Sequence, residues 1–403
     1  MINVEKILIE DYTYNLPNER IAVYPLPKRD DSKLLVYKSG KITDERFYNL
    51  PQQLPPNGLL VLNNTKVIEA RLFFKKPSGG VIEIFCLEPH EQSMETALQQ
   101  HGSCKWQCLI GGASKWKPGQ VLQKSLSVED KQVILQARYL GKTEDSFIIQ
   151  FDWQPGDFHF VQVLHAAGAI PLPPYIKRGA EEIDASRYQT IFGKYEGSVA
   201  APTAALHFTD AVFEALRKKN IHTEFVTLNV GAGTFKPVKS QAIADHQMHG
   251  EDFTVEKAAL QKIIEADTVV AVGTTSLRTL ESIYWLGVKL LNGTLADEWI
   301  LGQWEVYSLP GDVDYKKSLS AIVYWMEQKN ITQLHCRTSL LIVPGYQFKI
   351  PSALVTNFHQ PQSTLLLLVA AFIGEDWKKV YEHALQNDYR FLSYGDSSLL
   401  FKS

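Results

Sequence analysis

Residues 197–209 read Gly-Ser-Val-Ala-Ala-Pro-Thr-Ala-Ala-Leu-His-Phe-Thr, and the rest of the chain is organised around this run of small side chains. Small residues let a backbone approach a ligand closely, and His207 is the one titratable side chain in the run. Thr209 is placed to cap a helix in which apolar residues recur at helical spacing from Val212 to Leu216. The run would therefore lie at the positive end of a helix dipole, which favours an anionic ligand. A tight turn with a structural histidine explains the same residues.

Apolar segments elsewhere predict the buried strands of an α/β sheet, at residues 58–62, 224–230, 268–272 and 354–356. Each is followed by small or polar residues, namely Asn64 and Lys66; Gly231, Gly233 and Thr234; Thr274, Thr275 and Arg278; and Asn357, His359 and Ser363. Ligands of open α/β sheets bind at the carboxyl ends of the strands, so we expect these loops to converge with residues 198–207 on one pocket. Ordinary turn and helix-cap chemistry is the alternative at each junction. Residues 389–396 are interpreted as a terminal strand that carries polar and aromatic groups.

A second group of titratable side chains follows at His246, His249 and Glu251. His249 and Glu251 would share one face of a strand, and a carboxylate can orient and tune an imidazole for general acid–base chemistry. The same side chains could hold a metal ion, but a clear third ligand is missing from the sequence and we predict no metal site. A hydrogen-bonded surface cluster is the remaining alternative.

Residues 72–153 follow a different sequence pattern, in which short runs of alternating apolar residues are separated by turns rich in glycine and charged residues. This pattern is typical of a small antiparallel β-barrel. Because the segment interrupts two α/β stretches, we predict that it is an inserted domain. The main α/β domain would then comprise residues 1–71 and 154–403.

The composition describes an ordinary protein of 403 residues, 45% of them apolar and 21% charged, with a formal net charge of −3. Nucleic-acid binding would have to come from local patches such as the lysines at 75 and 76. Four cysteines and an amino terminus without a signal-like stretch favour a cytoplasmic location. The longest apolar run, residues 365–373, is too short to span a bilayer, which takes about 20 residues.

Taken together and in this order, these motifs resemble the S-adenosylmethionine:tRNA ribosyltransferase-isomerase family of queuosine biosynthesis. Residues 197–209, 246–251 and 356–366 carry the resemblance most specifically. The family transfers and rearranges the ribosyl part of S-adenosylmethionine onto 7-aminomethyl-7-deazaguanine at the wobble position of tRNA. Adenine and methionine leave, and the product is epoxyqueuosine-tRNA.

The resemblance implies a curved mixed sheet in the main domain, a barrel insert, and an active site on the main domain. It implies S-adenosylmethionine as ribosyl donor, no further cofactor and no metal. It also implies binding of the tRNA anticodon stem-loop, and we expect a monomer that does not bind membranes. The donor's sulfonium acidifies its 5′ carbon, so the reaction needs a base near that carbon. The ordinary pKa of histidine, about 6.5, suits that role.

The catalytic residues expected from motif and position are His207, His249 and Glu251, with His207 as base or adenine contact and Glu251 orienting a histidine or the ribose. The expected substrate-binding residues are Asn64, Lys66, Arg71, Ala201, Pro202, Thr203, Gly231, Gly233, Thr234, His246, Thr274, Thr275, Arg278, Asn357, His359 and Ser363.

The chain departs from the family pattern at several of its motifs. Asparagine stands at 64 where aspartate is expected, lysine at 66 where arginine is expected, and asparagine at 229 in place of histidine. Gln360 and Gln362 replace leucine and lysine, and residues 282–338 form a longer segment than usual. Two alternatives to the enzyme therefore stay open, a tRNA-binding paralogue with impaired catalysis and an S-adenosylmethionine-dependent transferase with another acceptor.

Overall fold

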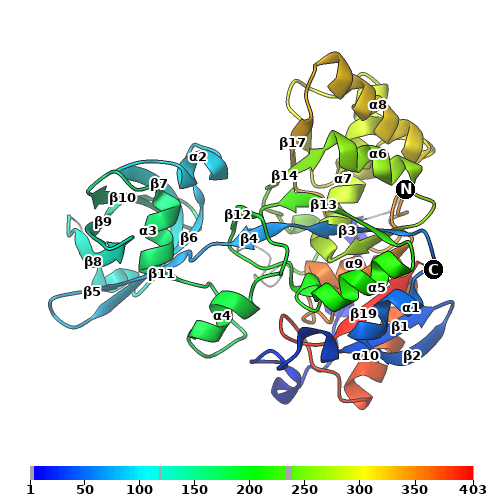
Figure 1. The fold of residues 1–403 in the computed structure, drawn as a ribbon, viewed down its shortest axis with the longest axis horizontal. Helices are drawn as coiled ribbons and strands as arrows, with labels where there is room; N and C mark the ends of the chain where they lie inside the picture. Colours follow the sequence, from blue (N-terminus) through cyan, green and yellow to red (C-terminus); the bar gives the residue numbers. More distant parts are fainter. Residues whose placement is uncertain (1–3, 118, 232–237, 239, 403) are drawn as a thin grey trace.

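The computed structural model describes residues 4–117, 119–231, 238 and 240–402, and Figure 1 shows its two large sheets standing apart. The larger sheet has ten strands, in the order β16 (Ile300–Leu301), β17 (Gln333–Thr338), β14 (Glu251–Glu256), β13 (His222–Leu228), β3 (Leu59–Asn63), β15 (Val269–Val272), β18 (Ala353–Asn357), β19 (Ser397–Phe401), β1 (Lys33–Lys38) and β2 (Lys41–Arg46). Parallel and antiparallel pairs both occur, so the prediction of an α/β protein with a mixed sheet is confirmed.

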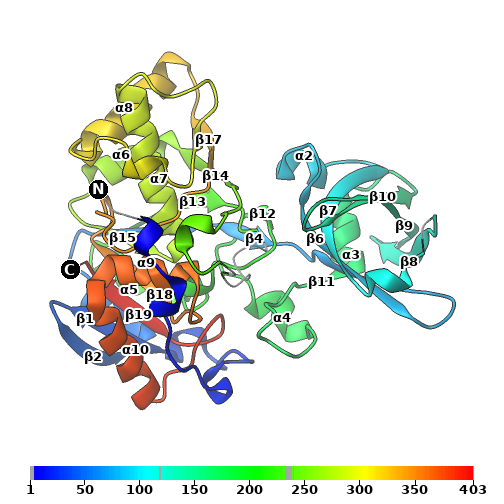
Figure 2. The same cartoon turned by 180° about the vertical axis from the view of Figure 1, so that it is seen from behind.

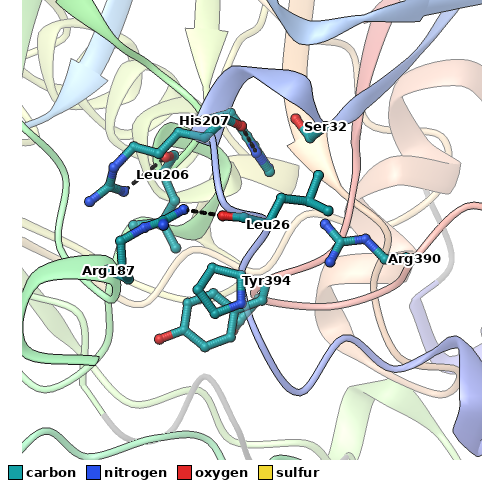
Figure 3. Close-up of a pocket in the computed structure, with 10 residues that line it drawn as sticks. Leu26, Ser32, Arg187, Leu206, His207, Arg390 and Tyr394 are labelled. Atoms are coloured by element: carbon teal, nitrogen blue, oxygen red, sulfur yellow. Dashed lines mark hydrogen bonds between the residues drawn. The ribbon is translucent and has the colours of Figure 1, made fainter. Parts of the chain in front are cut away.

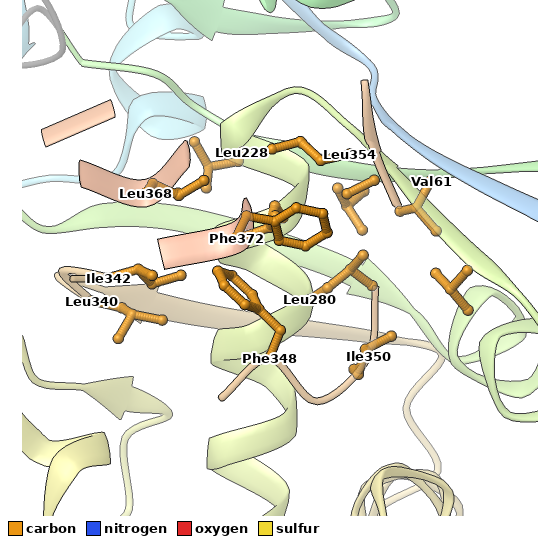
Figure 4. Close-up of a cluster of buried hydrophobic side chains, with 14 of the residues drawn as sticks. Val61, Leu228, Leu280, Leu340, Ile342, Phe348, Ile350, Leu354, Leu368 and Phe372 are labelled. Atoms are coloured by element: carbon orange, nitrogen blue, oxygen red, sulfur yellow. The ribbon is translucent and has the colours of Figure 1, made fainter. Parts of the chain in front are cut away.

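The central strand β3 is buried on both faces, which explains its uninterrupted apolar sequence. Leu59 and Val61 belong to one hydrophobic cluster, whereas Leu60 and Leu62 belong to another on the opposite face. Figure 4 shows the first cluster, in which Val61 lies among side chains from α7, α9 and the segment after β17.

Helices cover both faces of this sheet. The cluster that contains Val61 takes side chains from α6 (Lys257–Glu265), α7 (Thr274–Leu291), α8 (Tyr315–Gln328), α9 (Thr364–Ile373) and α10 (Trp377–Gln386). The opposite cluster takes side chains from α1 (Leu50–Gln53) and α5 (Asp210–Lys218). The Thr209 hydroxyl accepts a hydrogen bond of 3.3 Å from the Val212 N–H, so the predicted cap of α5 is confirmed.

The smaller sheet is antiparallel, with seven strands in the order β11 (Gly168–Ala169), β5 (Arg71–Lys75), β6 (Val81–Pro89), β7 (Ser103–Gly111), β10 (Phe147–Gln154), β9 (Lys131–Lys142) and β8 (Leu122–Val128). It curls until β5 and β8 contact each other, and α3 (Phe160–Ala167) packs against both. The hydrogen-bonded order of the described strands is that of a curled, open sheet. Its last strand lies beyond residue 153, where the insertion was expected to end, and the domain boundaries stay a prediction.

Short elements connect the two sheets (Figure 2). Strands β4 (Thr65–Val67) and β12 (Tyr195–Ser198) pair with each other between them, and α2 (Met94–Leu98) lies against β12. The chain returns from the smaller sheet through α4 (Glu182–Arg187).

The structure places two segments that the sequence left open or misassigned. Residues 282–338 form the rest of α7, the strand β16, the helix α8 and all of β17, and so extend one edge of the large sheet. Residues 389–396 were expected to be a strand, and this is wrong, because the strand β19 begins only at Ser397. A positive φ of 68° at Leu392 bends the chain before it.

Among the described helices, none combines the length and the apolar character that crossing a membrane would require.

Candidate active site

The carboxyl ends of adjacent parallel strands meet at one edge of the large sheet. The strands β13, β3, β15 and β18 run parallel to one another, so their carboxyl ends lie along the same edge. These residues include Asn64, Gly231, Thr274, Thr275 and Asn357. In an open α/β sheet, ligands bind at the carboxyl ends of the strands, so this edge is the expected binding site.

Residues 198–207 lie across this edge. The Ser198 hydroxyl accepts a hydrogen bond of 2.7 Å from the Val230 N–H, after the end of β13. A Cβ atom added to Gly273 would lie 3.8 Å from the Cβ of Ala204, and the short 3-10 helix at Thr203–Ala205 packs against β18. The small side chains therefore allow the backbone to lie against three strand ends, and Ala201, Pro202 and Thr203 lie within this contact.

His207 is buried at the end of this segment. Its Nδ1 lies 3.4 Å from the carbonyl oxygen of Arg29, to which it can donate, and its Nε2 lies 3.5 Å from Nδ2 of Asn357. Burial, with a smaller contribution from nearby arginines, lowers its pKa to about 4. His207 is therefore neutral at pH 7, and the expectation of an ordinary histidine pKa here is wrong.

Arginines from separate segments surround His207, and sequence reasoning missed their convergence. Figure 3 shows the side chains of Arg187 and Arg390 around the pocket that His207 and Tyr394 also line. Arg29 lines the same pocket. All of their guanidinium charges contribute to the lowered pKa of His207. The sequence signal was present in the basic pair at 28 and 29 and in the polar run 389–396, but nothing in the sequence placed the two together.

Glu251 and Arg278 form a buried ion pair further along the sheet. Nη1 of Arg278 donates to Oε2 of Glu251 at 2.5 Å, and both side chains are 8% exposed. Nε of Arg278 donates to the Leu340 carbonyl at 3.1 Å, whereas its Nη2 is buried without a partner among the described residues. Glu251 thus pairs with an arginine that the sequence did not predict, and its expected role of orienting a histidine or the ribose stays a prediction.

His246 and His249 lie in the loop before β14. His249 is exposed, and burial together with the charge of His249 lowers the pKa of His246. The lowered pKa favours the neutral form of His246. Gln303, in the longer segment 282–338, holds the loop by donating to the His246 carbonyl at 2.6 Å and accepting from the Met248 N–H at 2.9 Å.

The residues expected to bind substrate near β3 have protein partners. Oδ1 of Asn64 accepts a hydrogen bond of 2.7 Å from the Thr227 hydroxyl. Lys66 pairs with Glu196 at 2.9 Å, and Glu196 also contacts His165 of α3 at 3.0 Å. Their partners raise the pKa of His165 to about 9 and lower that of Glu196 to about 2.

Arg71 lies on the smaller sheet, where it pairs with Glu83 of the neighbouring strand. The structure therefore does not bring Arg71 to the edge of the large sheet together with Asn64. Gly233 and Thr234 lie outside the described residues.

The remaining predicted residues follow β18. His359 is buried with its Nε2 2.9 Å from the Thr356 hydroxyl, and burial lowers its pKa to about 3. The Ser363 hydroxyl caps α9 by accepting from the Leu366 N–H at 3.2 Å, which is the capping alternative noted for that position. Asn357 differs from both, because its Oδ1 is buried without a hydrogen-bond partner among the described residues.

Residues 9–400 match the family described as queuosine biosynthesis protein. The chain belongs to this family. Among curated relatives of this queuosine biosynthesis protein, the S-adenosylmethionine:tRNA ribosyltransferase-isomerase of Azoarcus sp. strain BH72 is 38% identical, with 98% of each chain covered. The enzyme of the same name from Chlorobaculum parvum is 36% identical over 97% of this chain and 99% of its own. The resemblance stated from the motifs is thereby confirmed.

A solved structure of S-adenosylmethionine tRNA ribosyltransferase from Thermotoga maritima is 30% identical to this chain. It aligns with 97% of this chain and 100% of its own, at a TM-score of 0.45. Among the described residues of this chain, no group of three or more His, Cys, Asp or Glu side chains could hold a metal ion.

Proposed function

We propose that this chain is an S-adenosylmethionine:tRNA ribosyltransferase-isomerase. It transfers and isomerises the ribosyl part of S-adenosylmethionine onto 7-aminomethyl-7-deazaguanine at the wobble position of tRNA. The products are epoxyqueuosine-tRNA, adenine and methionine. The observation that carries the proposal is the match to the family over residues 9–400, together with full-length relatives that bear this name.

The proposed active site is the edge of the large sheet at residues 198–207. Close backbone approach is available there, and the amide of Asn357 and the imidazole of His207 adjoin each other. The buried Oδ1 of Asn357 can accept a hydrogen bond from an exocyclic amino group such as that of adenine.

His207 serves as the base or as an adenine contact. Because Nδ1–H donates to the Arg29 carbonyl, Nε2 is the unprotonated ring nitrogen. Its lone pair faces the Asn357 amide N–H at 3.5 Å, and it can accept a proton once that long contact gives way. Glu251 holds Arg278 in place, and that arginine keeps one unpartnered Nη atom with which to bind substrate. His249 remains a proposed catalytic residue and His246 a proposed contact, in the loop that Gln303 holds.

The finer assignments are part of the same proposal. S-adenosylmethionine is the ribosyl donor, and the enzyme uses no further cofactor or metal. The smaller sheet, with α3, is a β-barrel insert, and the protein acts as a cytoplasmic monomer on the anticodon stem-loop. Three lysines, at positions 75, 76 and 115, lie close together at one end of the smaller sheet. Nζ of Lys76 donates to the Lys115 carbonyl at 2.5 Å. Such a basic end suits a phosphate backbone.

The experiment incubates the protein with S-adenosylmethionine and with tRNA that carries the aminomethyl base, and measures released adenine with and without the RNA. Release that requires the modified RNA supports the proposal. RNA binding without release would point to the impaired paralogue, and release only with another acceptor would point to a different transferase. Unmodified tRNA is the matched control, because it lacks the accepting amine.

A further inference from the structure

The pocket beside His207 carries positive charge that nearby carboxylates leave largely uncompensated. Among the described residues, Arg29 and Arg187 form no ion pair and bond to backbone carbonyl oxygens instead. Arg390 has a single carboxylate near it, with Nη2 3.6 Å from Oδ1 of Asp396. The guanidinium groups are held close enough that Arg187 lowers the pKa of Arg29, after burial itself.

Polar atoms that line the same pocket lack partners. Ser32 is 1% exposed, and its hydroxyl has no hydrogen-bond partner among the described residues. Nε of Arg187 is also buried and unpartnered. The buried guanidinium N–H is a donor and the buried hydroxyl can donate, so one acceptor could satisfy both, and the surrounding positive charge favours an anion.

We propose that this pocket, bounded by Arg29, Arg187 and Arg390, binds a backbone phosphate of the RNA substrate. The inference rests on the proposed function for its ligand and goes beyond it by assigning a phosphate subsite. Planar guanidinium groups match the oxygens of a phosphate, and RNA supplies such anions along its whole backbone. The donor is the poorer candidate, because its sulfonium and ammonium cations would be repelled by the same arginines that attract its carboxylate.

A phosphate bound here would also act on His207. The arginines that lower the pKa of His207 would be partly neutralised by the bound anion, so the imidazole would become a stronger base once RNA is in place. The subsite would therefore position the accepting nucleotide and prepare the neighbouring histidine together.

The test compares tRNA binding by the variants Arg390→Gln and Ser32→Ala with that of the wild type. Arg390 is the pocket arginine whose hydrogen bonds to the protein are weakest, since its bond to the Tyr24 carbonyl is 3.3 Å long. Replacing it should therefore disturb the fold least. The control variant is Arg217→Gln, which removes an exposed arginine from α5 outside the pocket. Thermal melting of each variant shows that it is folded.

We expect Arg390→Gln to weaken tRNA binding at least about tenfold and to reduce the slope of log K against log salt by about 1. We expect Ser32→Ala to weaken tRNA binding less, and Arg217→Gln to leave the slope unchanged. Affinity for S-adenosylmethionine should be the same in all variants. Weakened donor binding with normal tRNA binding in Arg390→Gln would overturn the proposal in favour of the donor carboxylate. An unchanged salt slope in Arg390→Gln would overturn it in favour of a purely structural arginine.

Titration with inorganic phosphate separates this inference from the proposed function. The ring NMR signal of His207 should move on addition of phosphate in the wild type and not in Arg390→Gln. If the wild type binds tRNA without releasing adenine, the proposed function fails and the binding comparison still decides the subsite. If the wild type binds no tRNA, the inference of an RNA phosphate fails as well, and the titration shows whether the pocket binds phosphate as a free ion. A His207 signal that phosphate does not move would contradict a phosphate site of any origin.

Discussion

Two parts of the same sheet edge differ in whether their buried charges are compensated by the protein. At Glu251 and Arg278 a carboxylate and a guanidinium group compensate each other inside the protein. Around His207 the arginines meet carbonyl oxygens and one distant carboxylate, and the histidine between them is neutral. The difference indicates that the fold compensates most of the charge at Glu251 and Arg278, leaving one Nη atom of Arg278 for a ligand, whereas the charge around His207 is left for a ligand to compensate.

The largest effect expected from this comparison is on stability at the closed ion pair. Replacing Glu251 by alanine leaves the Arg278 charge buried without its partner, which costs about 3–5 kcal/mol. Urea unfolding should measure that loss. Glu83→Ala, which breaks a more exposed pair on the smaller sheet, is the control and should cost about 1 kcal/mol or less. A Glu251→Ala protein as stable as the wild type would remove the contrast between the two regions.

The next effect is on turnover at the open side. His207→Ala should lower adenine release at least about a hundredfold, the usual scale for a lost general base, and should leave tRNA binding nearly unchanged. His222→Ala is the control, because His222 is exposed at the start of β13. Near-normal turnover in His207→Ala would move the role of base to His249 or Glu251.

A third effect concerns pH, and its sign follows from the lowered pKa of His207. In the unfolded chain this histidine is protonated below about pH 6.5, its ordinary pKa. In the folded protein it is protonated only below its lowered pKa of about 4. The free energy of unfolding is therefore unaffected by this residue above pH 6.5, and it falls as the pH drops from 6.5 toward 4. Between pH 7 and pH 5 the loss amounts to about 2 kcal/mol.

This pH effect can be isolated by comparing urea unfolding of the wild type with that of His207→Gln at both pH values. His359, whose pKa is also lowered, is present in both proteins and its contribution cancels. An equal pH dependence in the two proteins would show that His207 is not held neutral by the fold.

The smallest effect tests the loop that carries His246. Gln303→Ala removes two hydrogen bonds to that loop and should cost about 1 kcal/mol, measured as a lower free energy of unfolding. Gln386→Ala removes an exposed hydrogen bond on α10 and should cost clearly less. If the two variants are equally stable, the longer segment does not support the loop.

The sequence predicted the features of this molecule that depend on local patterns. The apolar runs predicted β3, β15 and β18, and Thr209 predicted the start of α5, because burial periodicity and capping are encoded within a few residues. Placement of residues 198–207 beside Asn357 followed from the general behaviour of parallel strands.

Features that depend on distant parts of the chain could not be predicted. Arg29, Arg187 and Arg390 are far apart in sequence. The pairing of β1 with β19 brings Arg29 near Arg390, and the return through α4 adds Arg187. The pairing of Glu251 with Arg278 was missed for the same reason, since the nearby histidines were closer in sequence than the arginine. The neutral state of His207 required knowledge of burial, which sequence spacing does not give.

Hydrogen–deuterium exchange during addition of S-adenosylmethionine and modified tRNA tests the central claim most directly, because it reports which side of the edge receives the ligands. We predict slower exchange in the segments that line the His207 pocket, at residues 24–29, 186–188, 203–207 and 390–394. Protection confined to residues 246–251 and 278–281, with exchange around His207 unchanged, would contradict it.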